Sequence, residues 1–105
     1  MLTRIVKLHF DKEKVNSFLS FFETIKHKVN GFEGCKGMQL LQDIKTPEII
    51  MTYSQWENEE ALEKYRTSET FGEIWPKIKP WFIEKPEAWS VNTVFNGFSN
   101  KWRHH

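Results

Sequence analysis

The sequence predicts a single α+β domain in which helices cover one face of a four-stranded antiparallel sheet. Segments with the two-residue period of strands alternate with segments whose apolar residues recur every three or four positions, as in helices. Their order is strand, helix, strand, strand, helix, strand, which is two similar halves. The chain has 105 residues, a length that leaves room for only one core.

The first half opens with a strand predicted over 3–10, where apolar and polar side chains alternate. Asp11 offers an N-cap oxygen for the helix that follows. The helix is indicated by an apolar stripe at three- and four-residue steps, and it should end at Asn30-Gly31, where a left-handed cap is available. The residues of this stripe are Val15, Phe18, Leu19, Phe22, Ile25 and Val29.

Two further strands are predicted over 36–44 and 48–56, and the short turn at Thr46-Pro47 makes them an antiparallel hairpin. The second of these strands is apolar on both faces. One face carries Ile49, Met51 and Tyr53, and the other carries Ile50, Thr52 and Trp56.

The second half begins at Asn58, a candidate N-cap followed by two glutamates that suit a helix N-terminus. Thr67-Ser68 and Pro76 should interrupt this helical region, so we expect two or three short pieces. A last strand is predicted over 88–95. The chain therefore divides into a domain over 1–95 and a C-terminal tail over 96–105.

Right-handed crossovers of two such halves give the ferredoxin-like βαββαβ plait. Helices cover only one face of its sheet, whereas the strand over 48–56 carries apolar side chains on both of its faces. A soluble monomer rarely exposes so large an apolar face, so we expect two subunits to pack sheet to sheet as a homodimer, a dimeric α/β barrel. The same apolar residues would also suit a cavity for a small apolar or aromatic molecule.

Composition excludes several classes of partner. Fifteen basic residues against fourteen acidic ones leave a formal charge of +1, which does not favour binding to nucleic acid or an acidic membrane. No apolar run is long enough to span a bilayer and the N-terminus lacks a signal-peptide layout, so we expect a cytoplasmic protein. The single cysteine, Cys35, excludes an internal disulfide and a multi-cysteine metal site.

Residues 53–71 resemble the signature of antibiotic biosynthesis monooxygenase (ABM) domains. The segment has a strand ending in Trp-Glu, then Glu-Ala-Leu, an aromatic residue, and a Ser before Phe. The opening Arg4 to Leu8, the helix containing Phe18-Leu19 and the small-residue loop 31–35 also fall where that family places them. The resemblance covers most of residues 2–95.

The resemblance implies a dimeric ferredoxin-like barrel. It also implies that some similar proteins oxygenate polyketide-like aromatic compounds without metal or flavin, whereas others degrade heme. The chain departs from the pattern in having Tyr65 where many members place a His. It has no His between His27 and His104 and no Asn on its first strand, which does not favour the heme-degrading branch.

Candidate catalytic residues are His9, a possible general base on a phenolic substrate, and Tyr65, which could hold a ligand through its phenol. Tyr53, Trp56 and Trp75 are candidates for binding a planar substrate. The alternatives are a solvent-facing edge histidine and aromatic residues that simply fill the core. Lys64 and Arg66 are interpreted as part of a solvated charged face.

These observations favour a cofactor-independent monooxygenase in which the substrate, once deprotonated, reduces O2 itself. The alternative is a non-catalytic, small-molecule-binding or stress-related dimer of the same fold. No cofactor is predicted, and the terminal pair His104-His105 is not taken as a metal site.

Overall fold

A computed structural model of the protein describes residues 1–98 and contains four strands, three α-helices and two short 3-10 turns over that range. The strands are β1 (Leu2–His9), β2 (Cys35–Gln42), β3 (Ile49–Trp56) and β4 (Glu87–Asn92). The helices are α1 (Val15–Asn30), α2 (Glu59–Arg66) and α3 (Glu69–Ile78), and the 3-10 turns are η1 (Lys12–Lys14) and η2 (Lys79–Trp81).

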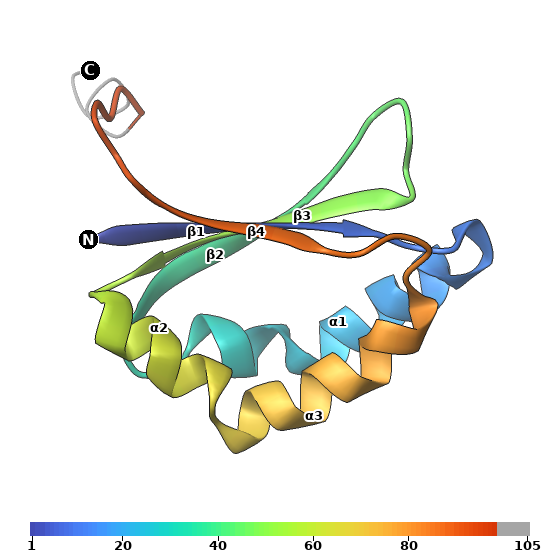
Figure 1. Ribbon diagram of the computed structural model, residues 1–105, viewed down its shortest axis with the longest axis horizontal. Coiled ribbons are helices and arrows are strands. Elements are labelled where there is room, and N and C mark those ends of the chain that lie inside the picture. Colours follow the sequence, from blue (N-terminus) through green and yellow to red (C-terminus); the bar gives the residue numbers. More distant parts are fainter. Residues whose placement is uncertain (99–105) are drawn as a thin grey trace.

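The four strands form one sheet in the order β2-β3-β1-β4, and each neighbouring pair is antiparallel. All three helices lie on the same face of this sheet (Figure 1). This arrangement confirms the predicted ferredoxin-like plait. The register places Ile5 of β1 between Tyr53 of β3 and Trp89 of β4, so these three side chains share the face without helices.

The two halves of the second helical region begin at the predicted caps. The Asn58 side chain accepts a hydrogen bond from the Ala61 backbone N–H at 2.8 Å, and the Ser68 hydroxyl accepts one from the Phe71 backbone N–H at 3.2 Å. The break at residues 67–68 is therefore confirmed. Pro76 lies inside α3, two residues before its end, and does not interrupt it.

Two predicted helix ends differ from the structure. Asp11 caps the 3-10 turn η1, and its carboxylate accepts from the Glu13 backbone N–H at 2.9 Å, so α1 itself begins only at Val15. The predicted left-handed cap at Gly31 is wrong. Gly31 has a φ of −93° and donates its N–H to the His27 carbonyl, which continues the hydrogen bonding of the last helical turn.

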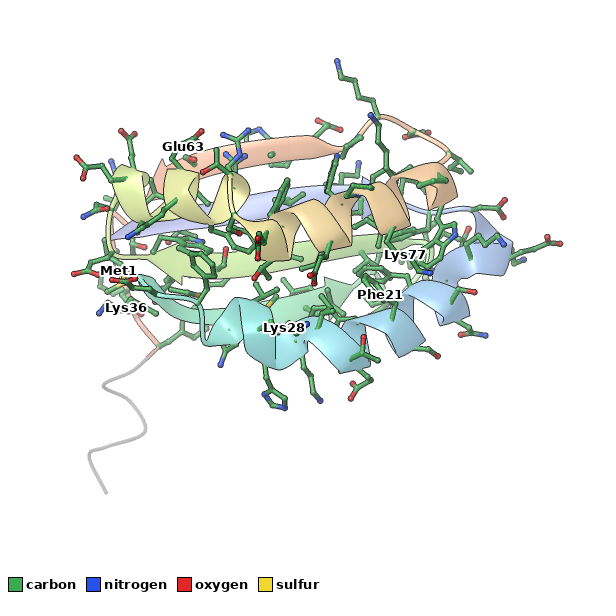
Figure 2. All side chains as sticks on the ribbon, turned by 90° about the horizontal axis from the view of Figure 1, so that it is seen from below. Met1, Phe21, Lys28, Lys36, Glu63 and Lys77 are labelled. Atoms are coloured by element: carbon green, nitrogen blue, oxygen red, sulfur yellow. The ribbon has the colours of Figure 1, made fainter. Side chains whose placement is uncertain are left out.

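The core lies between the sheet and the helices. Its three largest fully buried side chains are Phe10, Ile50 and Trp56. Seen from the helix side, α1 and the α2–α3 pair lie side by side beneath the sheet, with side chains filling the space between them (Figure 2). The apolar stripes of the helices therefore pack against the inward face of the sheet, as the apolar periodicity predicts.

The other face of the sheet is open. Leu41 on β2 and Trp89 and Val91 on β4 keep 40 to 45% of their surface exposed, although all three are apolar. After β4 the described chain leaves the sheet on this open side (Figure 1). Its side chains Val94, Phe95 and Phe98 are more than 80% exposed. The interpretation of His104 and His105 concerns residues outside the described range.

Candidate functional site

A cavity of about 360 Å³ lies between the sheet and the three helices. Most of its wall is apolar, and every strand and every α-helix contributes to it. The strand residues are Arg4, Val6, Leu8, Met38, Thr52, Ser54, Trp56 and Ala88, together with Pro86 just before β4. The helix residues are Phe18, Phe22, Ile25, Val29, Leu62, Tyr65, Arg66, Phe71, Ile74, Trp75 and Ile78.

Four aromatic rings form a continuous run along this wall. The ring centroids of Trp56 and Tyr65 are 5.1 Å apart, those of Tyr65 and Phe71 are 5.4 Å apart, and Phe71 stacks on Trp75 at 5.6 Å with an interplanar angle of 11°. Three of the five predicted site residues, Trp56, Tyr65 and Trp75, are thus brought together. Flat apolar walls of this kind suit a planar aromatic ligand.

The junction between α2 and α3 holds the centre of this run in place. The Ser68 hydroxyl donates to the Tyr65 carbonyl at 2.6 Å and accepts from the Phe71 backbone N–H. One side chain therefore links the last turn of α2 to the first turn of α3. Because Tyr65 and Phe71 flank this junction, the angle between the two helices sets how their rings meet.

The polar groups of the cavity are few. The Trp56 indole N–H donates to the Ser54 hydroxyl at 2.9 Å, so the deepest aromatic residue has its polar atom satisfied. Burial, assisted by the nearby Cys35, raises the pKa of Tyr65 to about 12. Its phenol therefore stays protonated well above neutral pH and is available as a hydrogen-bond donor.

The two charged residues of the cavity, Arg4 and Arg66, are not among the predicted site residues. Arg4 lies on the inward face of β1, and Arg66 ends α2; both line the cavity. The interpretation of Arg66 as part of a solvated charged face is correct in part, since its side chain is 49% exposed and lies 3.0 Å from Glu63, but the residue also borders the cavity. Arg4 did leave a signal, since it is the one charged residue among the apolar residues that alternate along that face of β1.

The remaining two predicted site residues lie elsewhere. His9 and Tyr53 are on the open face of the sheet, where His9 pairs across the strands with Ile49 and Tyr53 with Ile5. The His9 ring nitrogen Nδ1 lies 3.3 Å from a carboxylate oxygen of Glu84. Neither residue lines the cavity, and the catalytic and binding roles predicted for them stay predictions.

Comparison with known proteins places the chain in a family. The family model described as antibiotic biosynthesis monooxygenase matches residues 1–76. The chain belongs to the antibiotic biosynthesis monooxygenase family. A search of curated proteins found no match.

Solved structures agree with the ABM fold. A conserved protein from Methanosarcina mazei Go1 is 25% identical, with a TM-score of 0.81 over 88% of this chain and 92% of that one. A structure described as an antibiotic biosynthesis monooxygenase is 20% identical, with a TM-score of 0.84 over 90% and 99% of the two chains. A protein from Pseudomonas aeruginosa is 16% identical, with a TM-score of 0.79 over 90% and 94%.

Two parts of the ABM signature have structural roles in this chain. Ser68 joins α2 to α3, as described above. Ala61, in the Glu-Ala-Leu segment, faces Gly34 so closely that a methyl group on Gly34 would lie 2.5 Å from the Ala61 Cβ. These two parts of the signature therefore set how α2 packs against the loop before β2 and against α3.

The site shows no preformed metal centre within residues 1–98, since no three His, Cys, Asp or Glu residues cluster there as metal ligands would. In the same range, none of the helices is long and apolar enough to cross a membrane.

Proposed function

We propose that this ABM protein is a monooxygenase that oxidises a small aromatic or polyketide-like substrate in the cavity beneath the sheet, without a bound cofactor. Family membership supports the reaction class. The observation that carries the proposal is the run of Trp56, Tyr65, Phe71 and Trp75 along one wall of the cavity. A planar substrate would stack there while the Tyr65 phenol donates a hydrogen bond to its oxygen.

The chemistry would be supplied by the substrate. In an anthrone, the CH2 group loses a proton to give a stabilised carbanion, which passes an electron to O2. The two radicals combine as a hydroperoxide, and loss of water leaves a C=O group. One O2 is consumed and one water is released for each CH2 converted to C=O. A donor such as Tyr65 would stabilise the negative charge that develops on the substrate oxygen.

Oxygen uptake with anthrone and hydroquinone-type compounds tests this proposal. We expect uptake above the buffer rate with the wild-type protein, and a loss of about tenfold or more in Tyr65→Phe because one hydrogen-bond donor to the developing oxyanion is removed. Lys64→Gln is the matched control, since Lys64 lies on the same helix but does not line the cavity. Uptake equal to buffer with all these compounds would contradict the proposal.

His9→Ala measured in the same assay tests the prediction for His9 separately. A reduced rate would assign the imidazole a part in proton removal. An unchanged rate would leave His9 as a surface residue paired with Glu84.

We also propose that the protein is a homodimer formed through the open faces of two sheets. Support comes from the apolar side chains left exposed on that face, Leu41, Trp89 and Val91, because soluble monomers rarely leave a contiguous apolar face uncovered. Light scattering after size exclusion at micromolar concentration should give twice the chain mass of 12.6 kDa. A monomeric mass would contradict the proposal.

A further inference from the structure

The charge of the cavity is one-sided. Arg4 and Arg66 line it, and no Asp or Glu side chain does so within the described part of the chain. Arg4 is partly buried, whereas the Arg66 side chain keeps 49% of its surface exposed and pairs with Glu63. A guanidinium group in a mostly apolar wall is costly to desolvate unless something compensates its charge. This cost falls mainly on Arg4, and an acceptor inside the cavity would offset it.

Arg4 has a neutral partner only. Its Nη1 donates to the Ser90 hydroxyl on β4 at 3.0 Å, and residues 1–98 give it no ion pair within 4.0 Å. A guanidinium has five N–H donors, so most of the donors of Arg4 are left for water or a ligand. Burial, and after it the charge of Arg66, lower the pKa of Arg4, and the nearby charge of Glu63 partly opposes this; the group stays charged at neutral pH.

Arg66 reaches the same cavity from the helix layer. It is the last residue of α2, directly after Tyr65, and its Nη1 donates to Glu63 at 3.0 Å. Glu63 itself does not line the cavity. Arg4 pairs in register with Ser54 of β3, and Ser54 bonds the Trp56 indole. The two cations therefore stand at the Trp56 and Tyr65 end of the aromatic run.

We propose that the cavity binds an organic anion whose aromatic body stacks along the run from Trp56 to Trp75 and whose oxyanion, a carboxylate or an ionised phenol, is held by Arg4 and Arg66. This inference rests on the proposed function, because it assigns the charge of the substrate. Planar guanidinium donors match a carboxylate in two parallel hydrogen bonds and also stabilise a phenolate.

Calorimetry with a matched pair of ligands tests the charge requirement. 2-Naphthoate and 2-naphthamide have the same ring system and nearly the same shape, but only the first is an anion at neutral pH. We expect naphthoate to bind about tenfold tighter or more, because hydrogen bonds between charged groups are the strong ones. Arg4→Gln and Arg66→Gln should each reduce that preference about fivefold, and the double variant should abolish it. Lys64→Gln, a surface charge two residues from Arg66, should keep it.

The phenolate form is tested with 4-nitrophenol, whose ionised form absorbs visible light. Binding to a site that prefers the anion lowers the pH at which the bound phenol ionises, and the double arginine variant should remove this shift. A naphthoate preference identifies a carboxylate, and a shifted nitrophenol ionisation identifies a phenolate. Equal or absent binding of the naphthyl pair together with no nitrophenol shift would overturn the inference.

These outcomes separate the inference from the proposed function. Anion-selective binding without oxygen uptake would sustain the anion site and contradict the monooxygenase. Oxygen uptake that does not depend on Arg4 or Arg66, together with no preference for the charged ligand, would support the monooxygenase and contradict the anion site. Circular dichroism of each variant shows whether it is folded. The ratio of the dissociation constants for naphthoate and naphthamide does not depend on the fraction of folded protein.

Discussion

At the scale of single residues, the Tyr65 phenol has the clearest titration behaviour. Its pKa is raised from 10.0 to about 12, first by burial and then by Cys35. A raised pKa for an acid means that the folded protein holds the proton more tightly than the unfolded chain does. Stability from this source is complete below pH 10 and is lost as the pH rises toward 12.

The variant Tyr65→Phe should therefore flatten the alkaline end of the stability curve. Between pH 10 and 12 the wild-type free energy of unfolding should fall by about 2 to 3 kcal/mol more than that of the variant, because two pKa units correspond to that energy. Denaturant titrations at several pH values measure the difference. In a spectrophotometric titration at 295 nm the variant should lack the late tyrosine ionisation, and a late ionisation that survives in Tyr65→Phe would contradict the assignment.

At the scale of elements, the loop before β2 packs closely against helix α2. Gly34 has a φ of +87°, a conformation that favours glycine, and an added Cβ would lie 2.5 Å from the Ala61 Cβ. The Gly34 carbonyl also accepts the Glu57 N–H at 2.8 Å. This small pair lets the start of α2 approach the loop and so fixes where Tyr65 and Arg66 meet the cavity.

Gly34→Ala should destabilise the protein by about 2 to 4 kcal/mol, since it adds backbone strain and overpacks the contact. Gly72→Ala is the matched control. Gly72 lies in α3 with nothing within 4 Å of its added Cβ, so alanine should raise stability by about 0.5 to 1 kcal/mol through helix propensity. Urea unfolding of both variants checks the signs, and similar stabilities would contradict the packing argument.

The elements were largely predictable because their signals are local. Asn58 and Ser68 are caps whose side chains need only a neighbouring backbone N–H, and the strands follow from alternation. The cavity was not predictable in the same way. Alternation puts Arg4 on the same face of β1 as Val6 and Leu8, but whether that face is filled or leaves a space depends on how far the helices stand from the sheet. Arg66 is exposed and bonded to Glu63, as a charged helix face predicts, and only the position of α2 over the sheet brings it to the edge of the cavity as well.

At the scale of the whole molecule, the two faces of the sheet differ in what they contact. The inward face lines the cavity, and the open face carries Ile5, Tyr53 and Trp89 in register across three strands. The described segment after β4 leaves the sheet on that open side (Figure 1) and contains Phe95, which is 86% exposed. In a two-fold dimer, both subunits would contribute their copy of each of these residues to the interface. A single substitution would therefore change the interface at two places.

Trp89→Lys should therefore shift the protein from dimer to monomer. Trp89 is 43% exposed in the single chain, and an unpaired charge buried in each half of the interface should raise the dissociation constant by about a hundredfold or more. Asn16→Lys, which adds the same charge to the exposed side of α1, should stay dimeric. Sedimentation velocity over a concentration series measures both. Because Trp89 does not line the cavity, the monomeric variant should still prefer naphthoate to naphthamide, and a dimer as tight as the wild type would show that the contact lies elsewhere.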